Sequence, residues 1–458
     1  MGEDVQSEPL LNQSDLGSTA WWQQVADRGT PLVSQRDAQH CELTFLWREL
    51  AINSSGNTTG QHHTQVFIDL YSKTPHPTDQ LTTLQKIGHT DVWYWQVTVP
   101  HDWYGSYFLM PVTQQHAPPQ PDQNGQHNPQ KIRHWWINTM QQQAQADPFN
   151  RLPMHQGGWG IPLSQVQLAQ AEVLAVWQRF DQGVCEKLQG NLIEQQWQSQ
   201  LLGNQRRVWI YRSDDRRNDC SKGGNITRND HTHPNQPPPD LPLVILLDGQ
   251  YWAKQMPIFG PLDQLTQQQI LPPAVYVLID CIDPEHRSQE LPCNAQFWQA
   301  VQQELLPQVF RQQPFTDNPQ KTIVAGQSFG GLAAMYAGLL WPERFGAVLS
   351  QSGSFWWSDS HHRHPEVSEG KQSGWLTQQV LSQKNPDFPL RVFQEIGCYE
   401  NSMLADNQQM NQALQDAGHQ VFYREFRGGH DWICWRNGLL KGLMYLLNNQ
   451  THSLENKQ

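Results

Sequence analysis

The chain has 458 residues, of which 37% are hydrophobic and 16% charged, and its formal net charge is −12. This length is too great for one ordinary domain and predicts two or three. The negative charge argues against nucleic acid or an anionic membrane as a partner, and no run of about 18 apolar residues predicts a membrane span.

The cysteines and the start of the chain indicate the compartment. The seven cysteines are scattered, and none forms a C-x-x-C pair. They are typical of reduced thiols rather than of a disulfide framework. The acidic first residues lack the basic and apolar regions of a secretory signal. We therefore expect a cytoplasmic protein.

The first part of the chain predicts a β-sandwich. We expect a disordered tail over 1–17, and then a short helix that begins at Ser18 or Thr19 and contains Trp21 and Trp22. Short runs of alternating apolar residues follow, separated by turn residues. Such half-buried strands are typical of a β-sandwich. The predicted strands are 42–48, 65–70, 90–99 and 105–110.

Three less regular stretches complete the predicted domain plan. Residues 113–131 form a Gln- and Pro-rich insertion, predicted as a surface loop. Residues 161–200 are polar with helical character and connect the two halves, and 213–241 are a second insertion rich in Gly and Pro. We therefore expect an N-terminal domain over 18–200 and a catalytic domain over 201–458.

The second half alternates between apolar strands and helices. This alternation predicts an α/β domain with a mostly parallel sheet that is covered on both faces. Gly418 marks the end of the last predicted helix. The predicted strands are 208–212, 243–247, 274–280, 322–325, 347–351, 390–396 and 421–426, and the predicted helices are 294–309, 331–340 and 407–417.

The segment Gly326-Gln-Ser328-Phe-Gly330 carries the strongest chemical signal. A β-branched run precedes it and a helix-forming run follows it. This is the G-x-S-x-G elbow of α/β-hydrolases, in which a tight turn lifts the serine hydroxyl out of the sheet. The alternative is a Gly-rich turn that only packs a helix on a strand. We predict that Ser328 is the nucleophile.

The chain order of α/β-hydrolases places an acid and then a histidine after the nucleophile. His430 follows the last predicted strand, and the glycines before it allow a close approach of the backbone. Glu400 directly follows the strand 390–396 and is the preferred acid. Glu395, inside that strand, is the second choice, and the short side chain of Asp431 could hardly reach its neighbour His430.

Two backbone N–H groups are expected to form an oxyanion hole. One belongs to Phe329, the residue after the nucleophile. The other is expected from Gln250, in the loop after strand 243–247. Gly249 lets this backbone approach the site, and Asp248 either borders the donor or fixes the turn.

The elbow, the loop after strand 243–247 and the segment around His430 belong to longer sequence blocks. Through these blocks the chain resembles the enterochelin (enterobactin) esterases, which are ferric-siderophore esterases among the esterase-D-like α/β-hydrolases. The resemblance implies an immunoglobulin-like N-terminal sandwich and hydrolysis of the serine esters of a cyclic tri-(dihydroxybenzoyl-serine) ligand. It assigns Ser328, Glu400 and His430 to the triad and implies no cofactor, because the iron enters with the substrate. The blocks that carry it are 246–252, 271–280, 286–294, 324–331, 349–357 and 428–431.

A ferric tris-catecholate is strongly anionic, so a protein of charge −12 needs a locally basic pocket with aromatic faces for the catechol rings. The resemblance places Arg287 in an R-x-x-E-L block, where we expect it to bond Glu290 and shape the pocket wall, with a direct contact to the substrate as the alternative. The run His361–His364 is expected to be a solvated loop rather than a metal site. The other expected contacts are Arg206, Arg207, Arg436, Lys254, Trp356, Trp357 and Arg151.

Other functions remain open at this stage. A feruloyl or general carboxylesterase shares the elbow, and an acyl-enzyme can also pass its acyl group to an alcohol. A ferric-siderophore-binding protein without turnover is the alternative of a different class, and an intact nucleophile, acid and histidine argue against it.

Overall fold

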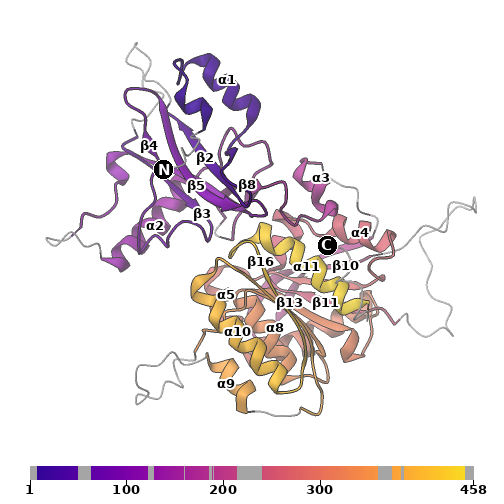
Figure 1. Ribbon diagram of the computed structural model, residues 1–458. Coiled ribbons are helices and arrows are strands. Elements are labelled where there is room, and N and C mark those ends of the chain that lie inside the picture. The colour runs from indigo at the N-terminus through magenta and orange to yellow at the C-terminus, as the bar shows by residue number, and fades with distance from the viewer. Residues whose placement is uncertain are drawn as a thin grey trace, which may run out of the picture. The chain divides into compact units, whose positions relative to one another are not determined.

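The computed structural model describes residues 8–49, 63–121, 128–158, 160–184, 188, 190–213, 240–358, 374–382 and 386–448. The chain forms two compact units. The N-terminal unit contains 1–173, 181–183 and 427–434, and the C-terminal unit contains the rest (Figure 1).

The start of the N-terminal unit is ordered over much of the expected tail. The short helix η1 (Pro9–Asn12) buries Leu10 against Trp21 and Trp22. Helix α1 (Thr19–Arg28) follows, and the Ser18 hydroxyl accepts a hydrogen bond from Trp21 N–H at 3.1 Å. The helix prediction is confirmed, but the tail prediction is wrong from residue 9 onward, because Leu10 has an apolar site to fill.

Two four-stranded sheets form the body of this unit, and the sandwich prediction is confirmed. One sheet has the order β1-β2-β5-β4 and the other β3-β6-β8-β7. Phe45 of the first sheet packs edge-on against Tyr107 of the second, at 4.7 Å between ring centroids. The strands are β1 (Leu32–Gln35), β2 (His40–Arg48), β3 (Gln65–Leu70), β4 (Gln85–Lys86), β5 (Val92–Pro100), β6 (Tyr104–Val112), β7 (His155–Gln156) and β8 (Pro162–Gln167).

Helix α2 (Pro129–Gln143) packs on the second sheet through Trp136, which contacts the rings of Phe67 and Phe108. Asn128 caps this helix by accepting hydrogen bonds from the N–H groups of Gln130 and Lys131. The predicted surface loop 113–131 is therefore wrong at its end, while its residues 122–127 lie outside the described part.

The connecting segment differs most from the prediction. In place of a polar helix, residues 161–200 contain β8, the short helices η3 (Ala175–Trp177) and α3 (Gln178–Asp181), and strand β9 (Asn191–Ser199). Strand β9 pairs with β10 (Asn204–Arg212) along its whole length and so belongs to the large sheet, which places the boundary between the units before residue 200. The strand was not predicted because its glutamines leave no clear alternation of apolar and polar residues, which is the pattern that indicates a strand.

The C-terminal unit is built on an eight-stranded sheet of order β16-β15-β14-β13-β11-β12-β10-β9. The strands from β16 to β12 are parallel, and β10 and β9 are antiparallel additions at one edge. The predicted parallel sheet is confirmed. Its remaining strands are β11 (Leu243–Leu246), β12 (Val275–Ile279), β13 (Thr322–Gln327), β14 (Ala347–Gln351), β15 (Arg391–Gly397) and β16 (Gln420–Phe426).

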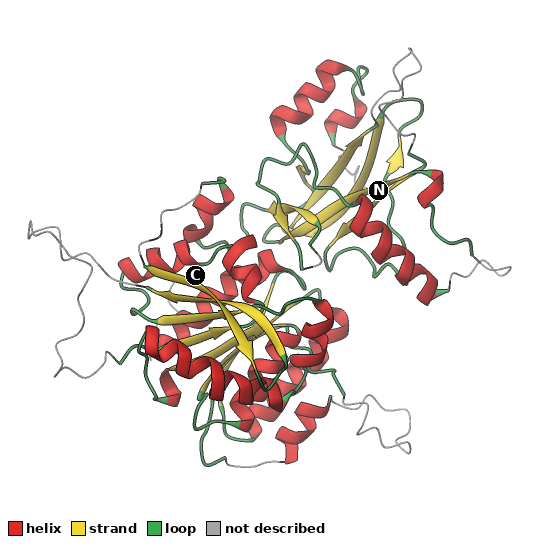
Figure 2. Ribbon diagram, turned by 180° about the vertical axis from the view of Figure 1, so that it is seen from behind, coloured by secondary structure: helices red, strands yellow, loops and turns green. Residues whose placement is uncertain are grey.

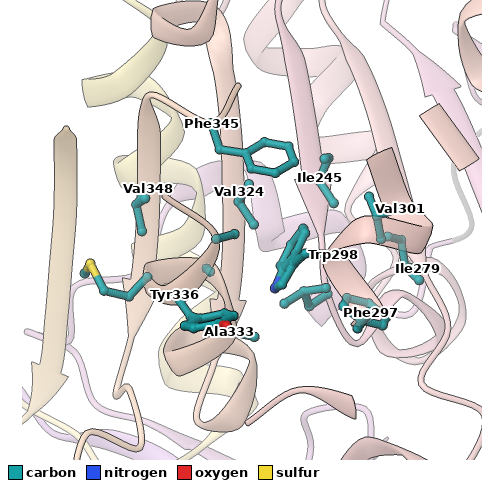
Figure 3. Close-up of a cluster of buried hydrophobic side chains, with 14 of the residues drawn as sticks. Ile245, Ile279, Phe297, Trp298, Val301, Val324, Ala333, Tyr336, Phe345 and Val348 are labelled. Carbon is teal, nitrogen blue, oxygen red and sulfur yellow. The ribbon is translucent and has the colours of Figure 1, made fainter. Parts of the chain in front are cut away.

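Helices cover both faces of this sheet (Figure 2). On one face, Trp298 packs against Phe345 and lies near Val324 and Ile245 (Figure 3). This face carries α6 (Ala295–Ala300), η5 (Val301–Leu305), α7 (Leu306–Gln312), α8 (Phe329–Leu340), α9 (Trp375–Ser382) and α10 (Asn401–Asp416). The three predicted helices lie among them.

The opposite face carries α4 (Phe259–Gln267), through Phe259 on Tyr211, and α11 (Trp432–Leu447). Gly442 lets α11 approach closely, because a Cβ there would lie 2.5 Å from the Leu349 side chain. The other short helices are η2 (Gln114–His116), η4 (Tyr251–Gln255), α5 (Pro284–Glu290) and η6 (Pro319–Lys321). In the described part of the chain, every helix is too short or too polar to cross a membrane.

Candidate active site

Ser328 lies in the sharp turn between β13 and α8, with φ 58° and ψ −120°. This is a strained backbone conformation for a residue with a side chain. Gly326 and Gly330 make the turn possible, because a Cβ on Gly326 would lie only 2.3 Å from the carbonyl oxygen of Gly330. The turn has the geometry of a nucleophile elbow, as the motif predicts.

The backbone around Ser328 is held from the neighbouring strand. Its N–H donates to the carbonyl of Gln351 at 3.0 Å, and its carbonyl accepts from Ser354 N–H at 3.1 Å. The hydroxyls of Ser328 and Ser354 are 3.3 Å apart. Ser328 itself is half-buried. Ser354 lies in the 349–357 block, but no local sequence pattern indicates that it contacts the nucleophile.

Phe329 and Gln250 have the expected backbone positions, one at the first residue of α8 and one after β11. The Gln250 side chain anchors its own loop, because its amide donates to Cys281 Sγ at 2.7 Å and accepts from Cys281 N–H at 3.2 Å. Gly249 lies directly against β12, since a Cβ there would be 2.5 Å from Ile279 N. Gln250 is therefore held on the end of the neighbouring strand.

Arg287 joins this loop to the elbow. Its guanidinium forms two bonds to Asp248, Nε to Oδ1 at 2.6 Å and Nη2 to Oδ2 at 2.8 Å, and Nη2 also donates to the Gln327 carbonyl at 3.2 Å. Its charge lies 5.9 Å from the centre of the Phe329 ring. The expected bond to Glu290 is wrong, because Glu290 pairs with Arg206 at 2.7 Å. Asp248 thus fixes the turn.

A row of polar side chains crosses the sheet directly below the nucleophile. Gln327, Gln351, Glu395 and Arg424 are direct neighbours on β13, β14, β15 and β16. Gln327 Nε2 donates to Gln351 Oε1 at 2.8 Å, and Gln351 Nε2 donates to Glu395 Oε1 at 2.5 Å. Arg424 closes the row with an ion pair to Glu395 at 2.9 Å. We call these four residues the polar ladder.

Glu395 serves the polar ladder and is not placed to act as the triad acid. It is fully buried, and burial raises the pKa of its carboxyl although the Arg424 charge acts in the opposite direction. Helix α11 covers it, since a Cβ on Gly438 would lie 1.7 Å from Glu395 Oε1. The second choice for the acid is therefore not supported.

Glu400 lies just beyond β15 and is held in one orientation. Its Oε1 accepts from the Ser352 hydroxyl at 2.6 Å and from Gly397 N–H at 2.9 Å. The Ser352 hydroxyl in turn accepts from Trp435 Nε1 at 2.9 Å. The side chain of Glu400 is buried. Ser352 and Trp435 escaped the sequence analysis, and only the 349–357 block pointed to the first of them.

His430 lies four residues beyond β16, in a stretch that packs within the N-terminal unit. Its N–H donates to the Ser72 hydroxyl at 2.9 Å. The neighbouring Asp431 carboxylate accepts from the N–H and the hydroxyl of Ser106, at 2.5 and 2.9 Å. The chain thus uses Asp431 for a bond to the sandwich.

The expected substrate contacts divide into buried and accessible residues. Arg206 and Arg436 are buried, Arg206 in its ion pair with Glu290 and Arg436 over the rings of Trp177 and Phe180, so neither forms the expected basic surface. The sequence could not indicate this burial, because the partners of the two arginines lie far away along the chain.

The aromatic residues of this set behave differently. Trp356 is 49% exposed, and its ring lies 5.9 Å from that of Phe329, whereas Trp357 packs edge-on against Trp375. The remaining members of the set are Arg207, paired with Asp280, Lys254, paired with Glu194, and the exposed Arg151. The run 361–364 lies outside the described residues.

Comparison with known families agrees with this geometry. A family model described as "Putative esterase" matches residues 228–446, and one described as "Enterochelin esterase, N-terminal" matches residues 42–177. The first match contains the elbow and the polar ladder, and the second contains the β-sandwich except for β1 and the first two residues of β2.

Curated relatives and solved structures extend the similarity to nearly the whole chain. The chain is 41% identical to the iron(III) enterobactin esterase of Dickeya dadantii, over 96% of this chain and 95% of that protein. It is 38% identical to that of Escherichia coli K12, over 94% and 96%. Among solved structures, the ferric enterobactin esterase of Salmonella typhimurium matches with a TM-score of 0.76 at 38% identity, over 94% of this chain and 99% of that one. The enterobactin esterase of Shigella flexneri, determined in the presence of enterobactin, matches with a TM-score of 0.74 at 37% identity, over 95% and 99%. The chain belongs to the family of iron(III) enterobactin esterases.

Proposed function

We propose that this enzyme hydrolyses the serine-ester bonds of ferric enterobactin, or of a related catecholate siderophore, and so releases its iron in the cytoplasm. The observation that carries the proposal is the strained elbow at Ser328 in a chain that matches enterobactin esterases almost from end to end. Among the described residues no cysteine forms a disulfide, which supports a reducing compartment.

The reaction begins with the Ser328 hydroxyl. Its oxygen attacks an ester carbonyl of the trilactone while His430 takes the proton. The N–H groups of Phe329 and Gln250 stabilise the oxyanion that develops. The carbon–oxygen bond to the leaving serine then breaks, and His430 returns the proton to that hydroxyl. The product of this half-reaction is an acyl-enzyme on Ser328.

Water completes the cycle. His430 removes a proton from water, whose oxygen attacks the acyl carbon, and the proton passes to Ser328 as the acyl bond breaks. Glu400 holds the imidazole in the required tautomer and stabilises the imidazolium. The two hydrogen bonds to Glu400 from Ser352 and Gly397 support this role, because they orient the carboxylate before substrate arrives.

The ferric ion is part of the substrate, and the proposed chemistry uses no resident metal or cofactor. For recognition we propose that Trp356 stacks a catechol ring, which its exposure beside Phe329 supports. Trp357 then supports Trp356 from the same turn rather than offering an open face, because it packs on Trp375. The guanidinium of Arg287 lies 5.9 Å from the centre of the Phe329 ring, but the carboxylate of Asp248 neutralises its charge.

The test is hydrolysis of ferric enterobactin by the wild type and by Ser328→Ala, with products resolved by chromatography. We expect linear dihydroxybenzoyl-serine products from the wild type and none above background from Ser328→Ala. Ser382→Ala, at an exposed serine on α9, is the matched control and should retain full activity. Failure of the wild type to form these products, with turnover of a feruloyl ester instead, would replace the proposed substrate. Equal turnover by Ser328→Ala would overturn the mechanism.

A further inference from the structure

Residues 427–434, here called the histidine segment, follow a strand of the large sheet but pack within the N-terminal unit. Four side-chain contacts tie this segment to the sandwich. Arg427 approaches Asp102 at 3.6 Å, and Cys434 Sγ donates to the Tyr104 carbonyl at 3.4 Å. The bonds from His430 N–H to Ser72 and from Ser106 to Asp431 lie between them.

The Asp431 contact is a buried network. Because the single hydroxyl proton of Ser106 is donated to Asp431, its oxygen accepts from His155 Nε2–H at 2.9 Å. All three side chains are at most 3% exposed. A buried carboxylate costs free energy, and the burial raises the pKa of Asp431 to about 6. Such a costly group placed next to the proposed base, His430, points to a task other than stability.

The glycine before His430 fits the same surface. A Cβ on Gly429 would lie 2.0 Å from both Cβ and Oγ of Ser72. Ser72 itself has φ 58°, a left-handed conformation that turns the chain sharply after β3. The glycine of the Gly-Gly-His sequence is thus needed for docking on Ser72, which gives the motif a reason beyond the approach to the elbow.

We propose that Ser72, Ser106, His155 and Asp431 are positioning residues: through them the N-terminal sandwich holds the backbone of His430 and so sets the imidazole for catalysis. The proposal rests on the proposed function, in which His430 is the base. The sandwich holds His430 through its main-chain N–H and holds the next residue, Asp431, through its side-chain carboxylate, so that two successive residues are fixed.

A purely structural role makes a different prediction. If these bonds only stabilise the unit, removing one lowers the melting temperature and leaves turnover of the folded enzyme unchanged. If they position the base, kcat falls while KM stays within about twofold, because displacement by about 1 Å can cost about 100-fold in rate. The reaction of Ser328 with a fluorophosphonate should slow in parallel, since it needs the same base but not the siderophore.

The experiment compares Ser72→Ala and Asp431→Asn with Tyr107→Phe. Tyr107 neighbours Ser106 on β6 but donates to Asp147 at 2.8 Å, so its substitution removes a buried hydrogen bond of the same sheet away from the histidine segment. We expect about 10- to 100-fold losses of kcat and of the fluorophosphonate rate in the first two variants. We expect less than a twofold change in Tyr107→Phe, with melting temperature measured for all three.

Each outcome decides the question. Unchanged kcat and fluorophosphonate rate in folded Ser72→Ala and Asp431→Asn, or an equal loss in Tyr107→Phe, overturns the positioning role. If Asp431→Asn does not fold, Ser72→Ala decides, because Ser72 is only half-buried. A further outcome separates the two proposals. If the wild type does not hydrolyse ferric enterobactin, but both variants react with the fluorophosphonate more slowly than the wild type does, the proposed function fails and the positioning role stands.

Discussion

The polar ladder of the large sheet and the histidine segment of the N-terminal unit each bury a carboxylate, but they hold it differently. Glu395 is paired with the guanidinium of Arg424 and accepts from a glutamine on the adjacent strand. Asp431 is held by the N–H and hydroxyl of Ser106 and by the N–H of Ile433, with no cation among these donors. Burial raises the pKa of both.

The difference lies in what each carboxylate secures. The polar ladder joins four neighbouring strands at matching register positions, so its loss should cost stability. The Asp431 bonds join residues 325 positions apart in sequence and fix a loop, so their loss should cost rate. A third carboxylate, Glu400, is oriented by a hydroxyl and a backbone N–H at the sheet edge, and we expect it to be the catalytic one.

The largest expected effect distinguishes Glu400, which follows β15, from Glu395, which lies within it. Glu400→Gln should lower kcat by about 10³- to 10⁴-fold, because a triad without its anionic acid no longer stabilises the imidazolium or its tautomer. Its melting temperature should change little. Steady-state hydrolysis of ferric enterobactin and a thermal melt measure both.

Glu395→Gln is the matched control for that experiment. It leaves Arg424 without its carboxylate and should lower the melting temperature far more than Glu400→Gln does. Folded Glu395→Gln should retain most of its kcat. A larger loss of kcat in Glu395→Gln than in Glu400→Gln would show that Glu395, and not Glu400, is the triad acid.

The next effect tests the polar ladder from its other end. Arg424→Met leaves the Glu395 carboxyl buried without its cation, and such a broken pair costs about 3–5 kcal/mol of unfolding free energy. Denaturant unfolding of the C-terminal unit's sheet, followed by circular dichroism, measures the loss. The double variant Glu395→Gln with Arg424→Met should recover part of it, because no charge is then left buried. A stability equal to that of the wild type in Arg424→Met would show that the pair is not stabilising.

Much of the fold could be predicted from local patterns. Strands β3 and β14 begin and end where their apolar residues indicate, and the elbow could be predicted because its steric need for glycine is confined to five residues. Strand β9 was missed because glutamines occupy its exposed positions, so that Trp197 is its only fully buried large side chain.

The site was less predictable because its parts meet only in three dimensions. The polar ladder depends on strand register, which no single strand reveals. Arg206 and Arg436 could not be distinguished from surface cations, since their partners Glu290 and Trp177 lie far away in sequence. The proposed role of Asp431 depends on Ser106 and His155 of the sandwich. Its position next to His430 in the sequence does not indicate these partners.

The smallest expected effect concerns the pH dependence of stability at Asp431. Its folded pKa of about 6 is above the unfolded value of about 3.9, so its contribution to the unfolding free energy is complete below pH 4 and is lost as the pH rises through 6. Relative to Asp431→Asn, which does not titrate there, the wild type should lose on the order of 2–3 kcal/mol between pH 4 and pH 7. Denaturant unfolding of both proteins at intervals across this range gives the difference.

Taking the difference between the two proteins removes the titrations that do not depend on Asp431. The titration of Asp69 is not removed completely, because burial raises its pKa to about 6 and the Asp431 charge raises it further. A constant gap between the wild type and Asp431→Asn from pH 4 to pH 7 would show that the carboxylate is not buried as described. The other outcome is that the stability advantage of the wild type over Asp431→Asn narrows or reverses at neutral pH, while the Asn variant still has the lower kcat. The sandwich would then retain an ionised Asp431 at a cost in stability, and only the placement of His430 would account for that cost.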